Sequence, residues 1–281
     1  MRKPSRFPFR LFVIVLWLLR LPFHWYRRRP TTIRNVLILH HLLLGDTLMV
    51  TPLLAKLREC YPDARLAMTV PYAYLALYAS APYGVEAIPF DPRILRTLWK
   101  LWRHPRADLV VLPADNRYSW LARALGARWI VAFASDKPAY KNWPVDELRP
   151  YSDKPTSFSD TCTELIDGPP PRPYQPSDWP APPYTAIRIP PTPYCVLHLG
   201  ASSPLKQWPS TRWRELAQWL TTHGYTVVWS AGIKETTLVD AADPEHTWYS
   251  TAGQLDLAQL WQLLSHAALL VSPDTLSLIH I

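Results

Sequence analysis

The sequence predicts an α/β protein made of two Rossmann-like domains, each built around a parallel sheet. From Ile33 onward, apolar runs alternate with helical patterns, which is the repeat that builds parallel sheets covered by helices. Prolines then crowd residues 169–193, where the chain must be extended, and a second alternating series follows them. A chain of 281 residues is long enough for two domains. Two such halves predict a cleft at the carboxyl ends of their strands, where this class of fold binds ligands.

The N-terminal domain is expected over residues 31–168. Its strands are predicted at short apolar runs: Val36–Leu39, Leu66–Val70, Val85–Phe90, Leu109–Leu112 and Trp129–Phe133. Its helices are predicted where apolar side chains recur at helical spacing: Thr47–Cys60, Tyr72–Ser80, Ile94–Arg103 and Tyr118–Leu125.

The proline-rich segment at 169–193 is predicted to be an interdomain linker, and the C-terminal domain is expected over residues 194–275. Its strands are predicted at 194–199, Thr226–Ser230, 247–250 and Ala268–Ser272. Its helices are predicted at 210–223, 234–241 and Leu255–Ser265.

The excess of basic charge is confined to the N-terminus. The chain carries 30 Lys and Arg against 22 Asp and Glu. Eight of these cations fall within residues 1–30, which contain no acidic residue, so the rest of the chain is balanced. A neutral body argues against nucleic-acid binding as the main function.

Residues 1–30 have the composition of a membrane-surface anchor. The apolar run Leu11–Leu19 is too short to span a bilayer, which takes about 20 apolar residues. Trp17, Trp25 and Tyr26 beside Arg27–Arg29 suit the headgroup region of an anionic membrane. We therefore expect a monotopic anchor on the cytoplasmic leaflet. The alternatives are a helix packed on the body of the protein and an uncleaved signal anchor.

The three cysteines, Cys60, Cys162 and Cys195, are widely spaced and form no CxxC pair. This spacing predicts neither a structural zinc site nor a disulfide framework. We expect buried free thiols in a reducing, cytoplasmic compartment.

The segment YCVLHLGASSPLKQWP, residues 194–209, has the composition of a phosphate-binding loop. A predicted strand ends at Gly200, where the backbone can approach a ligand closely. The hydroxyls of Ser202 and Ser203 and the cation of Lys206 follow, just before the predicted start of a helix. The spacing fits neither a Walker loop nor the GxGxxG fingerprint, so the sugar diphosphate of a nucleotide sugar is the expected ligand. No Asp-x-Asp pair suggests Mg²⁺, and no metal is expected. The alternative is a surface lysine on an ordinary loop.

Carboxylates follow three of the predicted strands. Asp46 comes after the first strand, where it could act as a general base on an acceptor hydroxyl or cap the next helix. Glu235 could accept hydrogen bonds from a ribose diol, or be a solvated residue at a helix start. Asp274 and Thr275 could hold sugar hydroxyls and a phosphate oxygen, or act as helix caps.

Taken together, these motifs resemble glycosyltransferase family 9, the lipopolysaccharide heptosyltransferases, from about Ile33 to Thr275. The resemblance lies in LGDTLMVTPLL, in HLGASSPLKQWP, in GYTVVWSAGIKE and in VSPDT, the start of a DTGxxH element. It implies a GT-B fold and an inverting, metal-independent transfer from a nucleotide-activated sugar, typically ADP-heptose, without a further cofactor. The implied acceptor is a lipid-linked glycan, the lipid A–core oligosaccharide, at the inner face of the bacterial inner membrane.

The resemblance also implies residue roles. Asp46 matches the base, Lys206 the phosphate-binding lysine, Glu235 the ribose-binding acid, and Asp274–Thr275 the start of the donor-binding element.

The chain departs from the family pattern in two places. Leu42 and Leu43 stand where small polar residues usually precede LGD, and Leu276 stands where the glycine of DTGxxH belongs. We expect residues 276–281, LSLIHI, to be a non-native tail on a C-terminally truncated domain, because no helix follows the capping residues Asp274 and Thr275. The alternative is a short protein with an apolar end. In that case the chain would be a non-catalytic, membrane-attached nucleotide-sugar-binding paralogue or an inactive fragment.

Overall fold

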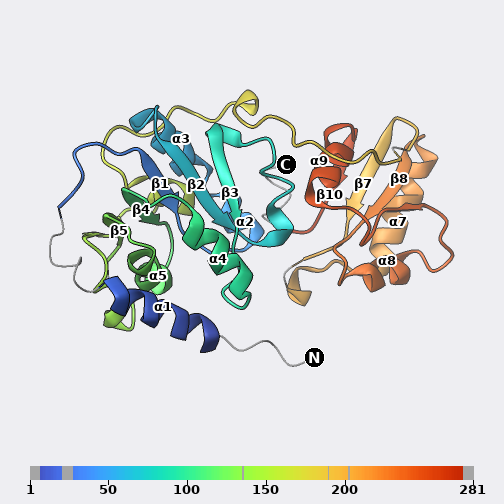
Figure 1. The fold of residues 1–281 in the computed structure, drawn as a ribbon. Helices are drawn as coiled ribbons and strands as arrows, with labels where there is room; N and C mark the ends of the chain where they lie inside the picture. Colours follow the sequence, from blue (N-terminus) through green and yellow to red (C-terminus); the bar gives the residue numbers. More distant parts are fainter. Residues whose placement is uncertain (1–6, 21–27, 135, 189, 202, 275–281) are drawn as a thin grey trace. The chain divides into compact units, whose positions relative to one another are not determined.

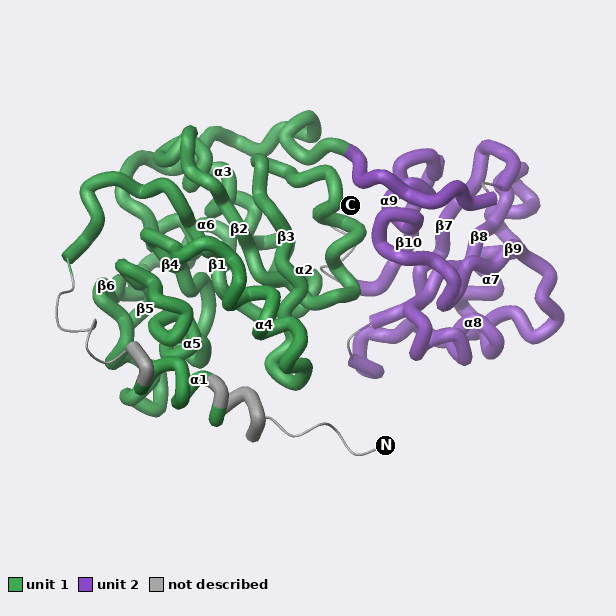
Figure 2. The backbone as a smooth tube through the Cα atoms, viewed as in Figure 1, with its two compact units in different colours: residues 1–180 green, residues 181–281 purple. Residues whose placement is uncertain are grey.

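The computed structural model describes residues 7–20, 28–134, 136–188, 190–201 and 203–274. The chain divides into two compact units, unit 1 at residues 1–180 and unit 2 at residues 181–281, which Figure 2 draws in different colours. The expected tail at 276–281 lies outside the described residues.

Unit 1 contains a six-stranded parallel sheet with the strand order β3-β2-β1-β4-β5-β6 (Figure 1). The strands are β1 Asn35–Ile38, β2 Arg65–Val70, β3 Val85–Pro89, β4 Leu109–Leu112, β5 Trp129–Phe133 and β6 Glu147–Arg149. The first five confirm the prediction, because apolar runs buried on both faces are typical of strands in a helix-covered parallel sheet. The short, polar β6 adds an edge that apolar runs do not signal.

The helices of unit 1 are α1 Phe7–Arg20, α2 Leu44–Leu48, α3 Thr51–Cys60, α4 Leu95–Arg103, α5 Ser119–Ala124 and α6 Phe158–Thr163. The single helix predicted over Thr47–Cys60 is wrong, because the chain breaks between α2 and α3. Pro52 lies in the first turn of α3, where its missing N–H is not needed, whereas its ring would clash with a helix continuing from α2.

The helix predicted over Tyr72–Ser80 is also wrong. The structure has a 3-10 turn at Tyr72–Tyr74 followed by turns whose amides bond three residues back, as Tyr78 does to Leu75. Trp179, far along the chain, packs on these turns: its ring lies beside Tyr78, and its indole donates to the Leu77 carbonyl at 3.4 Å. Tertiary contacts therefore override the helical spacing here.

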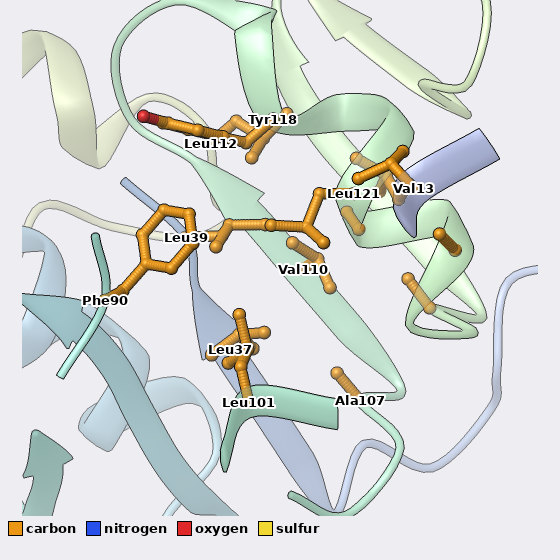
Figure 3. Packing of buried hydrophobic residues seen from close by; sticks show 14 of the residues in the cluster. Val13, Leu37, Leu39, Phe90, Leu101, Ala107, Val110, Leu112, Tyr118 and Leu121 are labelled. Carbon is orange, nitrogen blue, oxygen red and sulfur yellow. The ribbon is translucent and has the colours of Figure 1, made fainter. Parts of the chain in front are cut away.

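One face of the unit 1 sheet is covered by α4, α5 and α1. Leu37 of β1, Leu39 just after it and Val110 of β4 share a cluster with Leu101 of α4 and Val13 of α1 (Figure 3). The Trp17 ring meets the Trp120 ring edge-on at a centroid distance of 5.4 Å. The N-terminal helix thus packs on the body of unit 1, one of the arrangements that the sequence left open.

The other face of α1 is exposed. It carries Leu11, Ile14, Val15 and Leu18, each about half exposed. Among the described residues, none of the helices has the length and apolarity needed to cross a membrane.

The predicted linker is divided between the two units. Its first part packs on unit 1, where Trp179 is buried beside the ring of Tyr78 and the hydroxyl of Ser80 donates to the Pro180 carbonyl at 2.7 Å. Its later part belongs to unit 2, where the Thr185 carbonyl accepts from Gln259 at 3.4 Å.

Unit 2 contains a four-stranded parallel sheet with the order β10-β7-β8-β9. The strands are β7 Tyr194–His198, β8 Thr226–Ser230, β9 Tyr249–Ser250 and β10 Leu269–Val271, and the helices are α7 Ser210–Thr222, α8 Thr236–Ala242 and α9 Leu257–Ser265. All seven were predicted to within a few residues. Trp229 is fully buried in the core, and its indole donates to Asp243 at 3.0 Å.

The cysteines are free, as predicted, but only Cys162 and Cys195 are buried. The expectation that Cys60 is buried is wrong: it lies at the exposed end of α3.

Candidate functional site: the carboxyl edge of the unit 2 sheet

The carboxyl ends of three neighbouring strands bring most of the predicted donor residues to one edge of unit 2. Leu197 of β7 pairs with Trp229 of β8 and with Val271 of β10, and the three strands run parallel. The loops that follow them therefore leave the sheet at the same edge. These loops carry Gly200 and Lys206 after β7, Glu235 after β8, and Asp274 after β10.

The loop after β7 leads through a 3-10 turn, Pro204–Lys206, into α7. Ser203 caps this turn, because its hydroxyl accepts from the Leu205 amide at 3.3 Å. The residue before α7 is Pro209, which offers no side-chain acceptor to the helix. The first amides of α7 thus have no side-chain cap, and such amides favour anions. Ser202 lies outside the described residues.

Lys206 and Asp274 form an ion pair across the two loops. The Lys206 Nζ lies 2.6 Å from the Asp274 Oδ2, and both side chains are exposed. The prediction placed these residues in one donor site, and the structure brings them into direct contact. Thr275 lies outside the described residues.

Glu235 lies against Gly200, directly before α8. A Cβ atom on Gly200 would lie 2.2 Å from the Glu235 Oε2, so this close approach needs a residue without a side chain. The same carboxylate oxygen accepts from the Gly232 amide at 3.2 Å. The half-buried Glu235 is thereby held over the phosphate-type loop.

His198, the last residue of β7, is a site residue that sequence reasoning missed. Its Nδ1 lies 3.0 Å from the Ser230 Oγ, and its Nε2 would lie 3.0 Å from a Cβ on Gly200. Burial lowers the pKa of His198 to about 4, so the ring is neutral at physiological pH. Its place at the carboxyl end of a strand, two residues before Gly200, is the signal that could have found it.

Asp46 lies in unit 1, in the first turn of α2. It does not cap that helix: the N-cap residue is Leu43, whose side chain makes no capping hydrogen bond. The capping alternative for Asp46 is therefore wrong. Among the described residues no Lys or Arg forms an ion pair with the half-buried Asp46.

Two weakly acidic groups lie near Asp46. Burial raises the pKa of the Cys162 thiol to about 12, and the negative charge of Asp46 adds to the rise. Burial also raises the pKa of Tyr74. A hydrogen bond with the Leu44 backbone lowers this pKa, but by less, and the negative charge of Asp46 raises it further. Both groups are therefore protonated at physiological pH.

His40 and His41 follow β1. Burial, with a smaller effect of His41, lowers the pKa of His40 to about 3. Its amide donates to the Thr69 Oγ1 at 2.8 Å. Within the part of the chain that the structure describes, no groups of three or more His, Cys, Asp or Glu are arranged to hold a metal ion.

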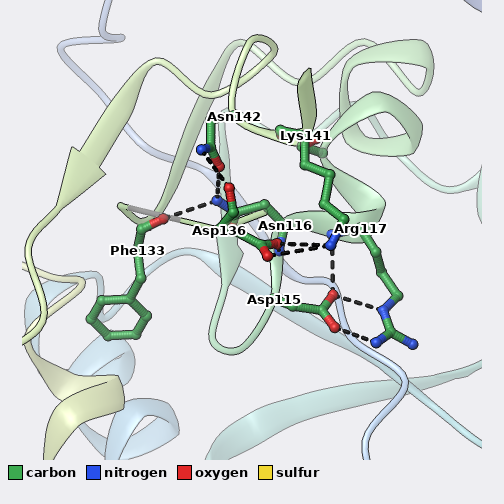
Figure 4. A network of polar contacts seen from close by, with 8 residues as sticks. Asp115, Asn116, Arg117, Phe133, Asp136, Lys141 and Asn142 are labelled. Atoms are coloured by element: carbon green, nitrogen blue, oxygen red, sulfur yellow. Dashed lines mark hydrogen bonds and ion pairs between the residues drawn. The ribbon is translucent and has the colours of Figure 1, made fainter. Parts of the chain in front are cut away.

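Asn116, in the segment Asp115–Arg117 after β4, connects the loops after β4 and β5 (Figure 4). Its backbone N–H donates to the Asp136 Oδ2 at 2.7 Å. Its Nδ2 donates to the Phe133 carbonyl at 2.9 Å and to the Asn142 Oδ1 at 2.6 Å.

Two ion pairs border this network. Arg117 pairs with Asp115, and Lys141 pairs with Asp136 at 3.2 Å (Figure 4). The network therefore orders the loops at the carboxyl edge of the unit 1 sheet.

Comparison with solved structures shows the same fold. A family 9 glycosyltransferase from Veillonella parvula has 15% identity and a TM-score of 0.68, covering 88% of this chain and 78% of that chain. E. coli heptosyltransferase WaaC with ADP-2-deoxy-2-fluoro heptose has 17% identity and a TM-score of 0.67, covering 88% and 86%. E. coli ADP-heptose lps heptosyltransferase II has 20% identity and a TM-score of 0.67, covering 86% and 80%. These matches confirm the predicted α/β fold of the GT-B type.

No curated protein matches the chain at a significant level. The family model described as glycosyltransferase family 9 (heptosyltransferase) matches residues 119–281. That match covers more than half of the chain and includes the loops with Gly200, Lys206, Glu235 and Asp274. The chain therefore belongs to glycosyltransferase family 9, the heptosyltransferase family, and is a glycosyltransferase.

Proposed function

We propose that the chain transfers a sugar, heptose from ADP-heptose, to a lipid-linked glycan such as the inner core of lipopolysaccharide. The observation that carries the proposal is that the loops with Lys206, Glu235 and Asp274 leave one sheet edge, where Lys206 pairs with Asp274 and Glu235 lies against Gly200. A cation beside two carboxylates on a glycine-containing loop matches a ligand that has both phosphates and hydroxyls.

Each of these groups has a proposed role in donor binding. Lys206, with the uncapped amides of α7 and the hydroxyls of Ser202 and Ser203, binds the diphosphate. Glu235 accepts from the ribose diol, and Asp274 with Thr275 binds sugar hydroxyls and a phosphate oxygen. Solved structures of the similar WaaC contain ADP or ADP-2-deoxy-2-fluoro heptose, which supports a nucleotide-sugar donor for this chain.

The proposed reaction is a single displacement with inversion. The acceptor hydroxyl oxygen attacks the anomeric carbon of the donor, and its proton passes to a carboxylate oxygen of Asp46. The bond from the anomeric carbon to the phosphate oxygen breaks, and its electron pair leaves with the diphosphate. Lys206 neutralises the charge that develops there, a task that a bound Mg²⁺ performs in many other nucleotide enzymes.

The proposed acceptor lies at a membrane. Residues 1–30 contain eight cations and no acidic residue, and α1 leaves an apolar face exposed. We place the protein at the cytoplasmic face of the inner membrane, bound through this basic arm to anionic lipid.

A transfer assay with the full chain tests the proposal. ADP-heptose and a heptose-free lipid A–core acceptor are incubated with the protein, and ADP release and acceptor mass are followed with and without EDTA. Equal release and mass gain in both conditions are expected, with inverted configuration in the product by NMR. Tight ADP-heptose binding without any mass gain would instead indicate a non-catalytic binding protein. A rate abolished by EDTA and restored by Mg²⁺ would contradict the metal-independent step.

A further inference from the structure

The helix α4 presents an unusual combination of side chains to solvent. The sequence from Arg93 to Arg106, RILRTLWKLWRHPR, contains five Lys or Arg and no acidic residue. Thr97, Leu98 and Leu101 are buried against unit 1. The opposite side, called here the α4 outer face, is exposed and consists of Leu95, Arg96, Trp99, Lys100, Trp102 and Arg103.

The tryptophans of the α4 outer face are exposed although they are large and apolar. Trp99 is 46% exposed and Trp102 is 38% exposed, and their ring centroids lie 5.0 Å apart. The Arg103 guanidinium lies 5.1 Å from the centroid of the Trp99 ring. Ile94, which precedes the helix, is also 46% exposed. An apolar patch rimmed by polar groups marks a surface that meets a partner.

The cations of this segment are available to an anionic partner. The nearby carboxylate of Glu86 already pairs with Arg65 and lies close to His104. Among the residues that the structure describes, neither Arg96, Lys100 nor Arg103 forms an ion pair with a carboxylate. The α4 outer face is therefore positively charged.

A second apolar surface lies on the same side of the unit 1 sheet. Leu98 and Leu101 of α4 share one buried cluster with Val13 and Leu16 of α1, so both helices cover the same sheet face. The exposed side chains of α1 follow the helical spacing i, i+3, i+4 and i+7: Leu11, Ile14, Val15 and Leu18. Aliphatic side chains of this kind have no stacking role with nucleic-acid bases, whereas they partition well into a lipid interface.

We propose that the α4 outer face docks on the surface of an anionic phospholipid bilayer, beside the exposed face of α1. Trp99 and Trp102 lie at the level of the headgroups, and Arg96, Lys100 and Arg103 attract the lipid phosphates. The partner is an anionic membrane because aromatic and aliphatic groups occur together with unpaired cations and without any acid. The α4 outer face would be a second membrane contact, in addition to the basic arm. This proposal does not depend on which sugar is transferred.

Vesicle partitioning of the full chain tests the proposal. Three double variants are compared with the wild type on phosphatidylglycerol-containing and on pure phosphatidylcholine vesicles. They are Trp99→Ala with Trp102→Ala, Arg96→Gln with Lys100→Gln, and a control, Trp143→Ala with Lys154→Gln. The control changes an exposed lysine and a tryptophan that is 70% exposed, more than either α4 tryptophan, elsewhere in unit 1. Thermal unfolding of each variant confirms that it is folded.

The aromatic variant should partition about tenfold more weakly onto the anionic vesicles. The charge variant should lose about fivefold per cation removed on anionic vesicles and nothing on neutral ones. The control should match the wild type. Unchanged partitioning of both α4 variants, or an equal loss in the control, would overturn the proposal. So would a concentration-dependent dimer in sedimentation that the aromatic variant abolishes, which would make a second copy of the chain the partner, or RNA binding that the charge variant abolishes.

Sugar transfer to a deacylated, water-soluble acceptor separates this proposal from the proposed function. The α4 variants should keep the wild-type rate with that acceptor, because no membrane is involved. A failure of transfer in the wild type would contradict the proposed function and leave the vesicle result standing.

Discussion

The Nζ of Lys206 lies 2.6 Å from the Oδ2 of Asp274, and this contact joins the loops after β7 and β10. Both side chains are exposed, so the pair contributes less than about 1 kcal/mol to folding. Its consequence concerns ligand binding: a lysine already held at the sheet edge loses little side-chain freedom when a phosphate arrives. The diphosphate would then compete with Asp274 for the same ammonium group.

Replacing Lys206 by alanine should weaken ADP binding and leave adenosine binding unchanged. A hydrogen bond to a charged group is worth about 1.5–3 kcal/mol, which corresponds to a loss of roughly 10- to 100-fold in affinity. Isothermal titration with ADP and with adenosine measures the difference. Lys234→Ala removes an exposed lysine from the loop after β8 and serves as the control. Equal ADP affinity of Lys206→Ala and the wild type would contradict the phosphate role.

Gly200→Ala should displace Glu235, because the new Cβ would lie 2.2 Å from the Glu235 Oε2. We expect ADP affinity to fall about tenfold as the ribose contact is lost. The same substitution should cost far less affinity in a Glu235→Ala background, where that carboxylate is already absent. A double-mutant cycle of ADP affinities measures this coupling. Additive effects of the two substitutions would show that the close approach has no part in donor binding.

The sequence predicts that Lys206, Glu235 and Asp274 lie at one sheet edge, because the signals for this placement are local. Each of Lys206, Glu235 and Asp274 follows an apolar run, and parallel strands bring their carboxyl ends together regardless of strand order. The contact of His198 with Ser230 and Gly200 depends on the register between β7 and β8, which no local pattern encodes.

Two other elements also depend on contacts between distant parts of the chain, and the local sequence does not predict them. The edge strand β6 has the polar sequence Glu-Leu-Arg and owes its conformation to pairing with β5. The segment Tyr72–Ser80 has helical spacing but forms turns, on which Trp179 packs from far along the chain. Long-range contacts, rather than weak propensities, account for these differences.

The free energy of unfolding should fall as the pH drops from about 6.5 toward 4, in part because of His198. Its pKa is about 4 in the folded protein, against an ordinary value of 6.5. Between these values the unfolded chain binds a proton that the folded one does not, so acid favours unfolding. This residue contributes a slope of up to about 1.4 kcal/mol per pH unit.

The variant His198→Gln should remove that part of the slope in urea unfolding between pH 5 and pH 6, a window chosen from the His198 pKa of about 4. His266→Gln, which changes an exposed histidine of the same unit, should retain the slope. A wild-type slope in His198→Gln would mean that this ring is protonated in the folded protein.

Asp46→Asn should abolish sugar transfer while donor binding is retained. The amide keeps the size of the side chain and cannot accept the acceptor's proton, so we expect the transfer rate to fall by about 100-fold or more. Asp63→Asn, which changes an exposed carboxylate of unit 1 after α3, is the matched control and should transfer at the wild-type rate. Single-turnover transfer and ADP-heptose titration, measured on the same preparations, separate the chemical step from binding. If Asp46→Asn transferred sugar at the wild-type rate, another group would have to accept the proton. Among the described residues no Lys or Arg forms an ion pair with Asp46, so the substitution breaks no such pair. A change in the transfer rate would therefore report on the carboxylate itself.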